Sequence, residues 1–132
     1  MKKSISLKQI FVMIAVFLPS LIFAQDKNSK EVSTVKLIQT PRKFENGELK
    51  LKAGNYQFEV VNKNIDTEVA FVLRKEKDRE SMDLSTALPN SLLKNTLKNG
   101  EKGKTGVVEL ESGQYVYGCP LNGTPIYTIT VE

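Results

Sequence analysis

The sequence predicts an all-β fold, namely an antiparallel Greek-key β-sandwich of about six to eight strands. Two observations lead to this prediction. Apolar and polar residues alternate in several short segments, as they do in strands with one buried face. Turn-forming Gly, Asn and Pro residues separate these segments at short intervals. The stretch 74–104 differs because it is rich in charge, and there we expect loops and one short helix.

The first 24 residues are predicted to be a secretory signal peptide of bacterial type. Three lysines precede the 14-residue apolar run 10–23, and Ala24 is a small residue at the expected cleavage site. The run is shorter than the roughly 20 residues of a membrane span, so we expect no stable span after cleavage; a retained N-terminal anchor is the alternative. The protein would then be periplasmic or secreted, with a disordered leader over 25–30 and one domain over 31–132.

Composition excludes several classes of function. The chain of 132 residues has one cysteine and no histidine, so it lacks an internal disulfide and the commonest acid–base and metal-binding side chain. We therefore expect no enzymatic activity. Of the 19 Lys and Arg residues, three lysines leave with the signal peptide, and 16 then face 15 Asp and Glu. A formal charge of about +1 gives no indication of nucleic-acid binding.

Four strands are expected before residue 74. Pro41 ends the first because it has no N–H for a β-ladder. Asn46-Gly47 and Gly54-Asn55 are turn dipeptides that bound the next two. The fourth is apolar at every position, which is typical of a central strand covered on both faces. These strands are expected at 32–38, 48–52, 56–62 and 69–73.

The charged stretch 74–104 contains Pro89 and only scattered apolar residues. Leu92, Leu93 and Leu97 have helical spacing, which predicts a short helix over 91–98 beneath the sheet. A connection of this length is unusual in a compact domain. It is either this helix with flanking loops or a functional excursion.

The C-terminal third returns to the strand pattern. We expect Tyr115, Tyr117 and Cys119 to share the inner face of one strand, because they alternate along it. Gln114 and Val116 would lie on the opposite face and tolerate polar substitution. The three expected strands cover 107–110, 114–119 and 127–132.

Residues 113–119 read Gly-Gln-Tyr-Val-Tyr-Gly-Cys. This segment resembles the glycine, aromatic, aromatic, cysteine strand of the cupredoxins, the family that includes plastocyanin, and 128–131 resembles their closing strand. Upstream, 49–62 is similar to the family's second strand pair, which ends in an asparagine, and 69–73 to the strand that follows. The resemblance covers nearly all of the predicted mature chain except 74–104. It implies the same sandwich.

The resemblance also implies where copper ligands would lie. A blue copper site uses a thiolate, two imidazoles and usually a weak axial thioether. The family's cysteine, the histidine three residues later and the methionine eight residues later correspond here to Cys119, Asn122 and Tyr127. The family's other histidine corresponds to Glu68. One of four ligand types remains, so an ordinary blue copper site is excluded, and we expect no metal and no other cofactor.

A different metal site is the alternative. Cys119 with Glu68, and Met82 or Asp83 from the long connection, could form a mixed oxygen and sulfur site, and a thiolate with a thioether would favour cuprous ion. Some cupredoxin-like domains of periplasmic iron-uptake proteins also depart from the histidine ligand set. The protein would then be a copper or iron carrier or an electron-transfer protein. Otherwise Cys119 is a small buried apolar residue.

The leading hypothesis is a cupredoxin-like binding or interaction module without a blue copper site. Its binding surface would be the segment 120–127, at the end of the sandwich where the family builds its site, because loops on a rigid scaffold often carry binding residues. Tyr127 could instead belong to the core. The partner would be an envelope protein or a small ligand, which the sequence does not identify. The candidate contact residues are Leu121, Asn122, Thr124, Ile126 and Tyr127.

Overall fold

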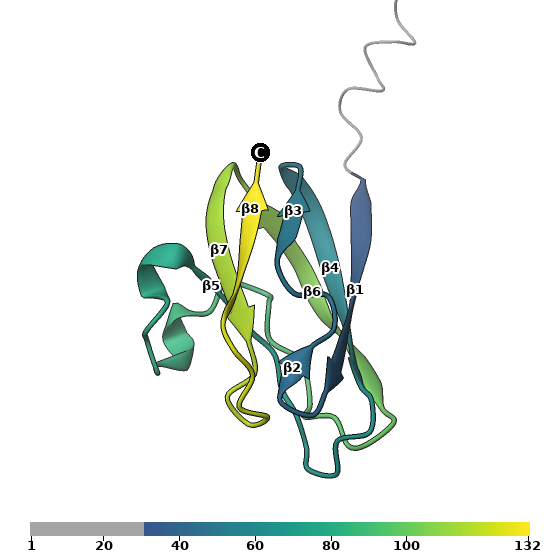
Figure 1. Cartoon of the computed structure of the whole chain (residues 1–132). Coiled ribbons are helices and arrows are strands. Elements are labelled where there is room, and N and C mark those ends of the chain that lie inside the picture. The colour runs from purple at the N-terminus through teal and green to yellow at the C-terminus, as the bar shows by residue number, and fades with distance from the viewer. Residues whose placement is uncertain (1–30) are drawn as a thin grey trace, which may run out of the picture. The chain divides into compact units, whose positions relative to one another are not determined.

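Two four-stranded sheets face each other in the part of the chain that the computed structural model describes, residues 31–132 (Figure 1). The predicted signal peptide and leader lie outside these residues. The first sheet has the order β2-β1-β4-β6 and the second has the order β3-β8-β7-β5. The strands of the first sheet are β1 (Val32–Thr40), β2 (Lys43–Phe44), β4 (Gly54–Asn62) and β6 (Lys102–Leu110). Those of the second are β3 (Leu49–Leu51), β5 (Val72–Lys75), β7 (Gly113–Gly118) and β8 (Tyr127–Val131). The predicted all-β sandwich is therefore confirmed.

The sheets are mixed rather than wholly antiparallel, so this part of the prediction was wrong. Strand β4 runs parallel to β1, and β3 runs parallel to β8, whereas the other pairings are antiparallel. After β2 the chain crosses to the second sheet to form β3 and then returns to the first sheet beside β1. A strand that returns after such a crossing can run in the same direction as its neighbour, whereas a two-residue hairpin always reverses the direction.

The predicted helix over 91–98 is also wrong. The connection between β5 and β6 contains two short 3-10 helices, η1 (Glu76–Asp78) and η2 (Leu84–Thr86), and the 91–98 segment is not helical. Leu97 is buried and pairs with Val69 through two backbone hydrogen bonds of 2.9 Å, which requires an extended chain. Leu92 is exposed. Pairing with a distant segment therefore outweighed the helical spacing of the leucines.

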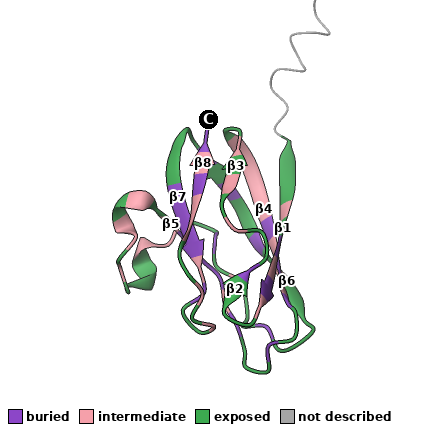
Figure 2. Ribbon diagram, viewed as in Figure 1, coloured by how far each residue is buried: buried purple, intermediate pink, exposed green. Residues whose placement is uncertain are grey.

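The core lies between the two sheets and is centred on aromatic side chains. Phe44 contacts Tyr117 edge to face at a ring-centroid distance of 4.9 Å, and Phe58 contacts Phe71 at 5.5 Å. Both Tyr115 and Tyr117 are buried, as the alternation along the segment predicted. Figure 2 shows buried segments in β1, β4, β7 and β8. The sandwich therefore holds a continuous apolar core without a disulfide.

The outer face of β7 is covered, contrary to expectation. Val116 is only 2% exposed, whereas Gln114 on the same face is exposed as predicted. Residues 76–88, which we call the side connection, lie on the outer side of β7 (Figure 1) and are attached there by Arg79, whose Nη2 donates to Thr128 Oγ1 of β8 at 3.2 Å. Val116 is therefore a poor position for a polar substitution.

Within residues 31–132, no helix is long and apolar enough to cross a membrane.

Candidate functional site

Cys119 follows β7 directly and is held from two sides. Its side chain is 2% exposed, and Sγ accepts a hydrogen bond from the backbone N–H of Ala70 at 3.2 Å. Its own N–H donates to Thr124 Oγ1 at 2.9 Å. Close packing continues at Gly118, where an added Cβ would lie 3.2 Å from the carbonyl oxygen of Pro125. The segment 120–127 is thus folded tightly against the end of β7.

Asn122 fastens this segment to the neighbouring sheet. Its Nδ2 donates to Gln39 Oε1 at 3.1 Å and to the carbonyl oxygen of Thr40 at 3.0 Å. Its Oδ1 accepts from the backbone N–H of Arg42 at 2.9 Å. The amide therefore has partners for both its oxygen and its nitrogen, so its role in this structure is to position the loop.

Tyr127 also has internal partners. Its hydroxyl oxygen accepts a hydrogen bond from the backbone N–H of Phe44 at 3.2 Å, and its ring lies 5.3 Å from that of Tyr117. Among the five predicted contact residues, Asn122, Thr124 and Tyr127 thus have partners within the protein. The other two, Leu121 and Ile126, are exposed apolar side chains.

A cavity of about 430 Å³ lies beside this segment, between the side connection and the outer face of β5 and β7. Its lining is mainly apolar and includes Val72, Met82, Leu84, Val116 and Ile126. Arg74, Arg79 and Glu80 are the charged residues that line it. Val72 and Val116 form part of its lining on the sheet side, and residues 79–82 and Leu84 form its lining on the side of the side connection.

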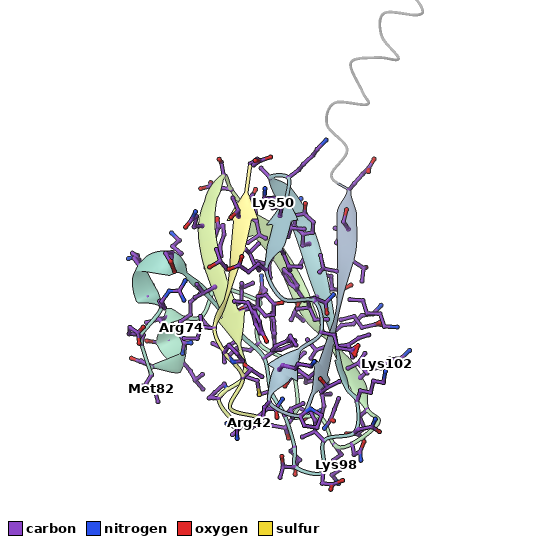
Figure 3. All side chains as sticks on the ribbon, viewed as in Figure 1. Arg42, Lys50, Arg74, Met82, Lys98 and Lys102 are labelled. Carbon is purple, nitrogen blue, oxygen red and sulfur yellow. The ribbon has the colours of Figure 1, made fainter. Side chains whose placement is uncertain are left out.

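Exposed apolar side chains gather around this cavity. Met82, Leu84 and Ile126 line it and are 43 to 89% exposed, and Leu121 follows Pro120, which also lines it. We call these four residues the apolar rim. Figure 3 shows Met82 at the outer side of the side connection. Sequence reasoning missed Leu84 and the covered face of β7, although the consecutive apolar residues 115–117 were a signal for a strand covered on both faces.

The two arginines of the cavity differ in their partners. Arg79 forms two hydrogen bonds of 2.9 Å with the carboxylate of Glu76, and this interaction raises the pKa of Arg79 although desolvation opposes it. Arg74 donates from Nε to Thr86 Oγ1 at 2.7 Å, and no carboxylate in the described part of the chain lies within 4.0 Å of it. Arg79 therefore forms an ion pair with Glu76, whereas Arg74 forms no ion pair within residues 31–132.

The residues of the alternative metal site are only partly brought together. Cys119 and Met82 line the same cavity, but Glu68 does not, and its carboxylate instead accepts a hydrogen bond from Thr96 Oγ1. In residues 31–132 no group of three or more Cys, Asp or Glu side chains is arranged to hold a metal ion.

Comparison with known proteins places the fold. No model of a protein family matches the sequence. No curated protein matches it either. Among solved structures, the chain is similar to auracyanin B, with 21% identity, 80% of this chain and 91% of that chain covered, and a TM-score of 0.60. It is also similar to auracyanin A of Chloroflexus aurantiacus, described as a "blue" copper protein, with 17% identity, 77% and 100% covered, and a TM-score of 0.55. For the reduced auracyanin of Roseiflexus castenholzii the identity is 13%, the coverage 79% and 99%, and the TM-score 0.55. The fold is therefore cupredoxin-like, as the resemblance implied.

The residues present do not fit a blue copper ion. The chain contains no histidine, so both imidazole ligands are missing. Asn122 and Tyr127, which stand where the resemblance places a histidine and a methionine, are engaged in hydrogen bonds within the protein. The chain thus has a cupredoxin-like sandwich without the histidine ligands of a blue copper site.

Proposed function

We propose that this cupredoxin-like domain is a binding module of the bacterial envelope that works without a blue copper site. The observation that supports this proposal is the apolar rim beside a cavity of about 430 Å³: Met82, Leu84 and Ile126 line the cavity. The fourth residue of the rim, Leu121, is exposed and follows Pro120, which also lines it. The ligand or envelope protein would contact the rim and enter the cavity. The periplasmic or secreted location rests on the predicted signal peptide.

The rim joins two segments that are distant in sequence. Met82 and Leu84 belong to the side connection, and Leu121 and Ile126 belong to the segment 120–127. Single exposed apolar residues are normal on protein surfaces, but a group that converges from two segments around a cavity is typical of an interaction site.

The half of the rim that belongs to the segment 120–127 is held in place by hydrogen bonds. Asn122 and Thr124 fasten the segment 120–127 through hydrogen bonds to β1, the β1–β2 turn and Cys119. A surface that is ordered before binding loses less conformational entropy when a partner binds. The internal hydrogen bonds of these two residues therefore favour recognition through the apolar side chains beside them.

Photocrosslinking in the native envelope tests this proposal. We expect a photoreactive benzoylphenylalanine at position 82 or 126 to yield the same discrete adduct on illumination. The control is the same residue at position 50, because Lys50 is exposed on β3 away from the cavity (Figure 3). Adducts of equal yield from position 50, or none from positions 82 and 126, would contradict the proposed surface.

The second candidate function is a metal carrier or electron-transfer protein. The observation that favours it is that the two sulfur-bearing side chains Cys119 and Met82 line the same cavity. Metal analysis and a visible spectrum of protein purified without a histidine tag test this candidate, because an added tag would itself bind copper. Stoichiometric metal would favour the carrier, and metal-free protein would favour the binding module.

A further inference from the structure

We propose that the cavity beside β7 binds a monoanionic amphiphile, an aliphatic carboxylate whose chain fills the cavity and whose carboxylate binds Arg74. This inference rests on the proposed function and specifies the chemistry of the ligand.

The cavity offers an apolar environment of suitable size. Val72 and Val116 are buried on the outer face of the sheet, and Met82, Leu84 and Ile126 surround the opening. A volume of about 430 Å³ lies within the range of small-ligand sites, roughly 300 to 1,000 Å³. An aliphatic chain would cover these side chains and release the water that contacts them.

Arg74 provides the anion-binding group. Its Nε–H is used by Thr86 Oγ1 at 2.7 Å, which fixes the orientation of the guanidinium plane. Neither of the ion pairs in residues 31–132 includes Arg74, and its terminal amino groups remain available as donors. Figure 3 shows Arg74 where the side connection meets the sheet. A planar guanidinium fork matches the two oxygens of a carboxylate.

Neighbouring acids favour a single negative charge on the ligand. Glu80 lines the cavity. The hydrogen bond from the Ser85 N–H is the main cause of the lowered pKa of Asp83, and the positive charge of Arg74 also contributes to it. These carboxylates would repel a dianion such as a phosphate monoester more strongly than a carboxylate. The arrangement therefore fits an amphiphile with one carboxylate.

An NMR titration of the protein purified from the envelope tests this inference with three probes. Octanoate has both the chain and the charge, octan-1-ol has the chain alone, and acetate has the charge alone. We expect octanoate to shift the amide signals of Val72, Val116 and Gly118 and to bind about tenfold more tightly than octan-1-ol, a difference equivalent to one charge-assisted interaction. Acetate should leave these signals unchanged.

Substitution of the arginine separates charge from shape. Arg74→Gln should reduce the affinity for octanoate to that for octan-1-ol. The matched control is Arg42→Gln, which removes the same group from a residue outside the cavity lining and should have no effect. Should Arg74→Gln fail to fold, the exposed rim position 84 provides a second comparison: Leu84→Asp should bind octanoate more weakly than Leu84→Asn, and both should bind octan-1-ol equally.

The outcomes distinguish this inference from the proposed function. Equal affinities of the wild-type protein for octanoate and octan-1-ol would overturn the role of Arg74 and leave the apolar binding site standing. If neither octanoate nor octan-1-ol shifts the amide signals, the proposal of a carboxylate ligand is wrong. The crosslinking experiment would then decide separately whether the rim is a contact surface.

Discussion

Asn62→Leu should lower the free energy of unfolding by about 3 kcal/mol, because it leaves the buried N–H and carbonyl groups of Ile65 without their hydrogen-bond partner. Asn62 is fully buried at the end of β4. Its Nδ2 contacts the carbonyl oxygens of Ile65, Thr67 and Leu97 at 3.1 to 3.2 Å, and its Oδ1 accepts from the Ile65 N–H at 3.0 Å. One side chain thus joins β4, the following turn and the end of the long connection.

Urea unfolding measures this effect, and Asn55→Leu is the matched control. Asn55 lies on the same strand, and its side chain has no hydrogen bond within residues 31–132, so its replacement should change the free energy of unfolding by about 0.5 kcal/mol or less. Equal losses in the two variants would show that the hydrogen bonds of Asn62 do not stabilise the fold.

Tyr117→Ala should lower the free energy of unfolding by about 3 to 5 kcal/mol, the usual range for removing a large buried aromatic side chain. The ring lies within 4.9 to 6.1 Å of the rings of Phe44, Tyr127 and Phe71, so its loss opens the centre of the core. The hydroxyl donates to the carbonyl oxygen of Gly47. Tyr117→Phe keeps the ring and should lose only about 1 kcal/mol, the net contribution of one hydrogen bond.

Alkaline pH offers a second measurement on the same residue. Burial raises the pKa of Tyr117, and the nearby Tyr127 adds to this effect. The folded state therefore resists ionisation of Tyr117, whereas the unfolded chain ionises it near pH 10. Stability that is fully present below pH 10 is lost as the pH rises above it. Wild-type protein should thus lose more stability above pH 10 than Tyr117→Phe, and an equal loss would place the hydroxyl in solvent.

Sequence alone predicted seven of the eight strands, because alternation of apolar residues reports directly which face of a strand is buried. The strand expected at 69–73 is β5 (Val72–Lys75), and it lies at the edge of its sheet, so the prediction of a central strand was wrong. Its apolar residues are buried on both faces because the side connection covers the outer face. The direction of β4 could not be predicted this way, because turn residues show where the chain reverses but not that it visits the second sheet between β2 and β4. The prediction of a helix over 91–98 was wrong because Leu97 forms a β-bridge with Val69, a partner 28 positions away. Local spacing carries no information on such a partner.

Only part of the candidate site could be proposed from the sequence, because the rest depends on contacts between distant segments. The resemblance to cupredoxins directed attention to the segment 120–127, where Leu121 and Ile126 are exposed. The hydrogen bonds of Asn122 could not be foreseen, since its partners Gln39 and Thr40 lie more than 80 positions earlier. The cavity depends on how the side connection covers Val116, which is a tertiary contact.

The accessibility of the Cys119 thiol distinguishes most directly between a copper-free binding module and a metal carrier. As a packed residue, Cys119 is 2% exposed, and its thiol accepts a hydrogen bond from the Ala70 N–H. As a metal ligand, it would have to be reachable and to lose its proton when metal binds.

The measurement is the rate at which a small thiol reagent labels the folded protein, with and without cuprous ion, in the presence of a reductant that is not a thiol. Urea-unfolded protein gives the rate for the free thiol. The packed site predicts slow labelling whose rate cuprous ion does not change. Fast labelling that one equivalent of cuprous ion blocks would contradict the copper-free module and establish Cys119 as a metal ligand.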